Sequence, residues 1–233
     1  MSGGAPAELV LADAESLQDL GRYAARARAL DADGAMRLQA VGPVLAAWVG
    51  VLPGSGVLGS GTTVGLRTSA LAEPVSLDVV VPLAAVSDRV ARPGERAVLP
   101  VPPMTVTAPW TAVSPPRSGW EPMGSVSSDA LRRNAVDGIA EVAAGTPDGA
   151  GAAAVATLRQ RVWGRPMTGV VTPAAADEGR MGGGADDAGE VPAALAFAAY
   201  ALGFVVADGE ATLARNGRWF RLTTLAGHAL TRA

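Results

Sequence analysis

Residues 210–224, EATLARNGRWFRLTT, decide the fold class of this chain. Asn216 and Gly217 form the dipeptide favoured in two-residue type I′ turns, and apolar and polar residues alternate on both sides of it. A turn centred on this pair predicts a β-hairpin with one apolar face. The pairs expected on that face are Leu213 with Phe220 and Ala211 with Leu222, while Thr212, Ala214, Trp219 and Arg221 point the other way. Because the preceding stretch 191–206 is apolar, we expect a C-terminal helix followed by this hairpin.

Further towards the N-terminus, three segments also alternate with a period of two, at 36–41, 64–70 and 75–81. This pattern predicts half-buried strands of an antiparallel meander with one face covered. The apolar run 43–53 is expected to be either a strand buried on both faces or a bend and continuation of the first strand.

Helical spacing of apolar residues predicts the remaining elements. We expect helices over 13–30, with Asp13 as N-cap, over 82–91, from Ser127 or Ser128 to about 145, and over 149–163. Helices and an antiparallel sheet that alternate in this way predict an α+β protein.

Composition predicts how the chain is divided into domains. Residues 172–190 contain many Gly, Ala and Asp residues and only one large aliphatic residue, Met181, which is typical of a flexible linker. We therefore expect an α+β core domain over 1–171 and a helix-hairpin unit over 191–233 that packs on this core. The linker contains five of the 22 acidic residues and one of the 19 basic ones, so the formal charge of −3 arises from this segment.

Two residue types are missing from the 233 residues. All 19 basic residues are Arg, and the chain has no Lys and no Cys. The chain therefore has no Lys for a Schiff base or for a phosphate-binding loop, and no Cys for a disulfide, a thiolate zinc site or an iron–sulfur cluster. Its longest apolar run, 191–207, is shorter than a usual membrane span, and we expect no membrane association.

The segment LPGSGVLGSGTTVG, residues 52–65, is a candidate phosphate-binding loop. Gly54, Gly56 and Gly59 fit the dinucleotide pattern G-x-G-x-x-G, and Gly56, Gly61 and Thr63 fit the spacing of a P-loop. However, Thr62 occupies the position of the P-loop Lys, and the residues that follow are poor helix formers. We therefore expect a connection between two strands, and we keep anion binding by Gly54, Gly56, Gly59, Gly61, Thr62 and Thr63 as the alternative.

The segment PWTAVSPPRSGWEP, residues 109–122, is a candidate protein-binding loop. Trp110, Arg117 and Trp120 stand among prolines, and Trp and Arg are enriched at binding hot spots. The alternative is that the Trp rings hold an otherwise unsupported loop on the core.

The remaining candidate sites favour neither metal binding nor nucleic-acid binding. His228 is the only histidine, and we expect it to be a surface or half-buried structural residue and the chain to hold no metal or cofactor. The order of helices and hairpin is similar to a winged helix, but the helix expected before the hairpin offers no Arg, Asn or Gln to read bases, so we do not expect nucleic-acid binding. Carboxylate pairs such as Asp31 with Asp33 leave the question of enzymatic activity open.

Four segments, VLPGSGVLGSGT, APWTAVSPPRSGWEP, RVWGRP and GRWFRLTTLAGHAL, resemble those of conserved, uncharacterised proteins of high-GC actinobacteria. The resemblance implies a cytoplasmic setting and no particular activity or site residue. We expect a non-catalytic cytoplasmic interaction or structural protein that binds a protein partner or self-associates into a homo-oligomer. The alternative is a small-molecule or anion-binding protein or enzyme that uses the Gly54–Thr63 loop for a nucleotide or phosphate.

Overall fold

The computed structural model describes residues 8–56, 59–91, 97–147, 149, 151–171 and 190–233. The chain forms two compact units, each with helices and antiparallel strands, so the protein is α+β as the sequence predicts. The first unit comprises Met1–Pro53, Val64–Ser114 and Ala201–Gly203, and the second comprises Gly54–Thr63, Pro115–Tyr200 and Phe204–Ala233. The linker predicted at 172–190 lies, except for Glu190, outside the described residues.

The first unit is built on two long neighbouring strands, β2 (Ala35–Leu52) and β3 (Thr63–Pro82). The prediction of three shorter strands over 36–41, 64–70 and 75–81 is therefore wrong. The last two segments belong to the single strand β3. Residues 72–74, which separate them, are exposed residues of this strand and do not form a turn. Of the two expectations for 43–53, continuation of the first strand is confirmed.

Gly42 explains why β2 looks like two elements in the sequence. Its φ of +61° is a backbone conformation that favours glycine, and the buried positions change from even to odd numbers on passing it. After the buried first residue Ala35, the buried side chains before Gly42 are Met36, Leu38 and Ala40, and those after it are Leu45, Ala47 and Val49. One irregularity thus keeps the same face of an 18-residue strand in the core.

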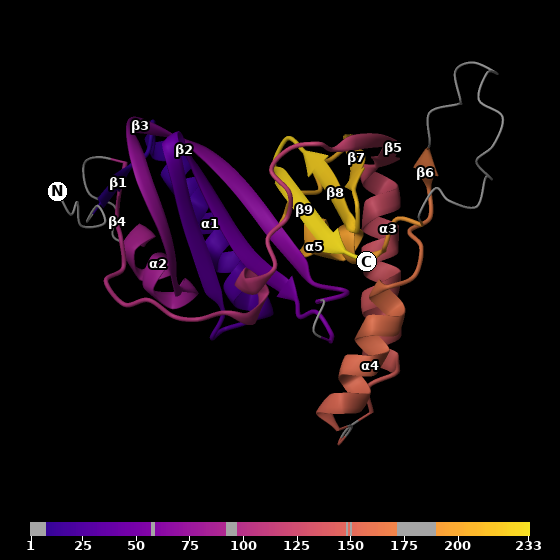
Figure 1. Ribbon diagram of the computed structural model, residues 1–233. Helices are drawn as coiled ribbons and strands as arrows, with labels where there is room; N and C mark the ends of the chain where they lie inside the picture. Colours follow the sequence, from indigo (N-terminus) through magenta and orange to yellow (C-terminus); the bar gives the residue numbers. More distant parts are fainter. Residues whose placement is uncertain (1–7, 57–58, 92–96, 148, 150, 172–189) are drawn as a thin grey trace, which may run out of the picture. The chain divides into compact units, whose positions relative to one another are not determined.

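Helices α1 (Ala14–Leu30) and α2 (Leu83–Val90) lie along these strands and pack on each other, as Figure 1 shows. The predicted cap is confirmed, because the Asp13 carboxylate accepts a hydrogen bond of 2.6 Å from the Ser16 amide. The short strands β1 (Glu8–Val10) and β4 (Val98–Pro100) pair in antiparallel orientation. Residues Pro109–Ala112 form the short 3-10 helix η1.

The second unit contains a sheet whose strands follow the order β9, β8, β7, β5, β6. These strands are β5 (Glu121–Ser127), β6 (Val170–Val171), β7 (Glu210–Asn216), β8 (Trp219–Thr224) and β9 (Gly227–Arg232). The predicted C-terminal hairpin is β7 with β8, whereas β5, β6 and β9 have no counterpart among the expected strands. The helix expected over 191–206 is shorter, since α5 spans Ala194–Ala201.

The register of the β7–β8 hairpin differs from the predicted one by two residues. Asn216 pairs with Trp219, so the turn residues are Gly217 and Arg218 rather than Asn216 and Gly217. Gly217 has a φ of +55°, as the first turn position of a type II′ turn requires. Asn216 remains in the strand because its side-chain amide donates a hydrogen bond of 2.7 Å to the Ser118 carbonyl.

A shift of two residues leaves the same side chains on each face of the hairpin. Leu213 now faces Leu222 instead of Phe220, and the predicted apolar face is confirmed. Its members Ala211, Leu213, Phe220 and Leu222 are all buried.

Two helices of this unit, α3 (Ser128–Ala144) and α4 (Ala152–Trp163), form a helical hairpin. Ser127 caps α3 by accepting from the Ala130 amide at 3.2 Å, which confirms one of the two predicted caps. The Trp163 ring stacks on Phe197 of α5 with the ring centroids 4.4 Å apart. A Cβ at Gly138 of α3 would overlap the Trp163 ring, so only glycine fits this contact.

We expect Gly138→Ala to destabilise the protein by about 1–3 kcal/mol, because the added methyl group displaces Trp163 from a packed position. Helix propensity alone predicts the opposite sign, a gain of up to about 1 kcal/mol. Urea unfolding followed by tryptophan fluorescence measures the difference. Ala140→Gly, an exposed site on the same helix, is the control and should lose about 1 kcal/mol from propensity alone. A Gly138→Ala protein at least as stable as the original would contradict the packing argument.

Candidate functional site

The glycine-rich segment Gly54–Thr63 connects β2 to β3, and five of its described backbone amides already have partners. Ser55 and Ser60 exchange hydrogen bonds of 2.8 and 3.1 Å, and the Gly59 amide donates to the Gly56 carbonyl at 3.2 Å. The amides of Gly61 and Thr62 donate to the carbonyls of Arg232 and Gly59, at 2.7 and 3.1 Å. Five amides that could face an anion are therefore directed at carbonyl oxygens.

The side chains of this segment are also engaged within the second unit. Thr62 and Thr63 are both buried. The Thr63 hydroxyl lies 2.8 Å from that of Thr231 and donates to the Gly61 carbonyl at 3.1 Å. These contacts tie the segment to β9.

Asp78 stands where the acid of a dinucleotide site would be expected. It lies in β3 and accepts two hydrogen bonds from the Arg37 guanidinium, of 2.7 and 2.6 Å, and a third from Gln39. This carboxylate is therefore part of a cross-strand ion pair in the first unit.

The three residues of the Trp-Pro segment belong to two different units. Trp110 lies in η1 of the first unit, where its half-buried ring covers Gly50 of β2. Arg117 and Trp120 belong to the second unit, and Arg117 is exposed. The position of Trp110 fits the alternative in which the Trp rings hold the loop on the core.

Trp120 is held in place by two contacts. Its indole N–H donates a hydrogen bond of 3.1 Å to the Pro116 carbonyl, and the Arg221 guanidinium carbon lies 4.6 Å from the centre of its ring. The bond from Asn216 to Ser118 fixes the same loop on the hairpin. Trp120 therefore stands over the face of the hairpin that is opposite to the apolar face.

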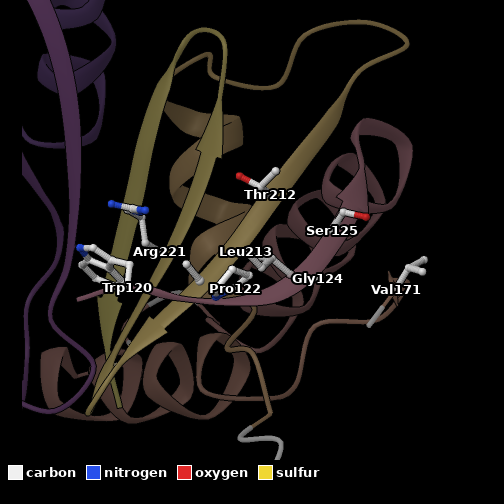
Figure 2. A pocket seen from close by; sticks show the side chains of 9 residues that line it. Trp120, Pro122, Gly124, Ser125, Val171, Thr212, Leu213 and Arg221 are labelled. Carbon is white, nitrogen blue, oxygen red and sulfur yellow. The ribbon is translucent and has the colours of Figure 1, made fainter. Parts of the chain in front are cut away.

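A groove with a volume of about 510 Å³ runs along this open face. We call it the Trp120–Arg221 groove. It is lined by Trp120, Pro122, Gly124, Ser125, Val171, Thr212, Leu213, Ala214 and Arg221. Figure 2 shows Trp120 and Arg221 near one end, with Ser125 and Val171 near the other. All of the lining residues belong to the second unit.

The strand pairings explain how distant segments form this groove. Ala214 of β7 pairs with Arg221 of β8 and with Pro122 of β5, and Ser125 pairs with both Thr212 and Val171. Paired residues project to the same side of a sheet, so these side chains share one face. Val171 is 65% exposed although it is a large apolar residue.

The groove contains one charged side chain and few polar ones. Arg221 makes no ion pair or hydrogen bond with any residue that the structure describes, and its Nε atom is buried. Burial lowers the pKa of Arg221 from its ordinary value. The Ser125 hydroxyl donates to Glu210 at 2.6 Å, while the lining residues that the structure describes include no carboxylate or imidazole.

Sequence reasoning identified Trp120 but not the rest of this groove. Thr212, Ala214 and Arg221 lie, as predicted, on the side of the hairpin away from the apolar face. Trp219, predicted on the same side, is buried and does not line the groove. The contribution of Pro122, Ser125 and Val171 was missed, because β5 and β6 join the sheet from about 90 and 40 residues away in the chain.

His228 is half-buried on β9, which is one of the two positions that the sequence predicts for it. Its Nδ1 lies 2.9 Å from the Thr223 hydroxyl. Burial, and then the positive charge of Arg221, lower the pKa of His228 below its ordinary value of 6.5. Within the described ranges we find no group of three or more His, Cys, Asp or Glu residues placed to hold a metal ion.

Two family models match the chain. One, described as a domain of unknown function (DUF8185), matches residues 115–233, and another, also a domain of unknown function (DUF8010), matches residues 5–110. The chain belongs to the DUF8185 family. The boundary between the two matches lies close to residue 114, where the first compact unit passes into the second.

Comparison with other proteins adds little beyond these two domains. A search of curated proteins found no relative of this chain. Among solved structures, the chain is similar to the DNA polymerase sliding clamp from Pseudomonas aeruginosa, with 11% identity and a TM-score of 0.49. The similarity covers 93% of this chain and 62% of the clamp chain, so this chain spans less than two thirds of that protein. None of the helices in the described part of the chain is long and apolar enough to cross a membrane.

The lowered pKa of His228 predicts a pH-dependent stability. The unfolded chain takes up a proton near pH 6.5, whereas the folded chain does so only at lower pH. The free energy of unfolding should therefore be constant above about pH 7.5 and fall by up to about 1 kcal/mol as the pH drops to 5.5. Urea unfolding of the original chain and of His228→Gln at both pH values measures this loss.

The variant should lose much less stability over the same interval. The carboxylates of Asp13, Asp19 and Glu141, whose pKa values are lowered in the fold, affect stability only at more acidic pH. An equal pH dependence in both proteins would show that His228 is not the responsible group.

Proposed function

We propose that this protein is a non-catalytic interaction protein and that it binds a partner protein through the Trp120–Arg221 groove. The observation that carries the proposal is an open sheet face on which a Trp ring, an Arg with no ion pair among the described residues and an exposed Val stand together. Trp and Arg are the side chains most enriched at binding hot spots, and exposed apolar patches mark interaction sites. We propose a cytoplasmic setting, which the resemblance of the sequence implies.

The chemistry of the groove supports binding rather than a reaction. Its described lining offers two hydroxyls, one guanidinium and apolar side chains, with no group suited to be a general base. Trp120 is fixed by the Pro116 carbonyl and by Arg221, so little side-chain entropy is lost when a partner covers its ring. A partner that packs across β5 and β7 would also cover Val171.

Thr212→Arg tests this function, because Thr212 is exposed in the groove and a long charged side chain there would fill it without entering the core. Thr157→Arg, at an exposed position on α4, is the matched control. Immobilised protein is used to capture binding proteins, and each captured protein is then purified and titrated against all three chains. We expect the dissociation constant to rise at least tenfold for Thr212→Arg and to stay unchanged for Thr157→Arg.

A second copy of the chain is included as a partner in the same experiment. Concentration-dependent dimerisation that Thr212→Arg abolishes, measured by sedimentation, would identify self-association through the groove. Partners that bind both variants equally, or no specific binding by any chain, would refute the proposed function.

A further inference from the structure

We propose that the Trp120–Arg221 groove recognises an acidic side chain in an extended segment of the partner, with Arg221 binding its carboxylate. This inference rests on the proposed function and adds the chemistry of the partner. It makes Arg221 the residue that determines specificity.

The first argument is charge complementarity. Arg221 is the only charged residue that lines the groove, and the residues that the structure describes provide it with no carboxylate. A partly buried cation without a counter-ion is costly, and an ion pair formed across an interface removes that cost. The rest of the described lining is apolar or carries a neutral hydroxyl, so no other cation there competes for an acidic group.

The second argument is the way in which Trp120 presents Arg221. With the guanidinium carbon 4.6 Å from its ring centre, the indole contacts the cation through its π-face and accepts no hydrogen bond from it. The Nε atom is buried, but the two terminal nitrogens are not among the buried unpaired atoms, so this end of the planar guanidinium fork stays available for a carboxylate, which Arg binds in bidentate geometry. A Lys at this position could supply the charge but not the fork.

The third argument concerns the end of the groove at which the acidic residue of the partner lies. At the other end of the groove, Ser125 donates its hydroxyl to Glu210, which places a carboxylate beside that end. The pair Thr212 with Ser125 and the pair Ala214 with Arg221 are two residues apart on β7, a separation of about 7 Å. The acidic residue of the partner is thus attracted to the Trp120 end and repelled from the Glu210 end.

A bound segment could lie across the open face of the sheet, or it could add a strand at the edge of β5. Backbone chemistry favours the first arrangement. Within the described part of the chain, β6 pairs with Ser125 and Val126 alone, so the edge of β5 beyond them is the place where another strand could be added. Pro122 lies in that part of β5 and has no N–H to donate. Recognition then depends on side chains, and Arg221 is the strongest determinant among them.

Phage display of random octapeptides on the full-length chain tests the inference, with Thr212→Arg as the groove-blocked reference. We expect the peptides enriched on the original chain over this reference to share one Asp or Glu at a fixed position. The best peptide is then titrated in a double-mutant cycle, with its acidic residue changed to the amide and Arg221 changed to Gln. Replacing the acid should weaken binding about tenfold on the original chain and less than twofold on Arg221→Gln.

Arg221→Lys separates the loss of charge from the loss of geometry. We expect it to restore part of the affinity for the acidic peptide, more at 50 mM salt than at 300 mM, because a Lys ion pair without the fork depends on charge alone. Circular dichroism and urea unfolding confirm that each variant is folded before it is titrated.

The outcomes distinguish this inference from the proposed function. Peptides that depend on the groove but share no acidic residue, or an acid preference that Arg221→Gln retains, would overturn the inference and leave the proposed function intact. A synthetic peptide of residues 172–190, TPAAADEGRMGGGADDAGE, is titrated in parallel. If it binds in the groove more tightly than the selected peptides, the acidic group belongs to this chain and the proposed partner is wrong.

Discussion

The antiparallel pairing of β7 with strands on both of its sides is the interaction on which the second unit depends. β8 follows β7 through a two-residue turn, whereas β5 is reached from about 90 residues earlier in the chain. Because β5 is paired with β7, Trp120, in the loop that precedes β5, lies over Arg221. β5 ends at Ser127, which caps the following helix α3. The groove, the helix that follows β5 and the position of the Trp ring are all set by this one long-range pairing.

The same strands explain how one sheet serves both stability and binding. Side chains alternate between the two faces of a strand, so every second residue of β7 and β8 is available for the core. Ala211, Leu213, Phe220 and Leu222 fill the buried face, and this face accounts for the hydrophobic stabilisation of the hairpin. The opposite face carries the buried Trp219 and the groove residues Thr212, Ala214 and Arg221, and a change at the exposed Thr212 alters the surface with little effect on the core. A site on this face can therefore vary in specificity while the fold is preserved.

Local features of the fold were predictable because their causes are local. Asp13 and Ser127 cap α1 and α3 through hydrogen bonds that span three residues, and α2 and α4 follow from spacing along a single segment. Predictions failed where a glycine or a distant partner changed the pattern. Gly42 shifts the buried positions of β2, and the bond from Asn216 to Ser118 moves the turn of the hairpin by one residue. The same holds for the candidate site. The sequence predicted Trp120 as a binding residue, whereas Ser125 and Val171 line the groove only because their strands pair in the folded sheet.

By itself, the sequence determined that this chain is α+β, that it has no lysine or cysteine chemistry, and which face of the C-terminal hairpin is apolar. These properties depend on composition and on periods of two or 3.6 residues, which act within a few residues of the chain. Only the tertiary structure decided that the donors of Gly59, Gly61 and Thr62 are used within the protein and that Trp120 stands over Arg221. The contacts of Gly61 with Arg232 and of Trp120 with Arg221 join residues about 100 or more positions apart, and no local pattern encodes which distant partner a residue will meet.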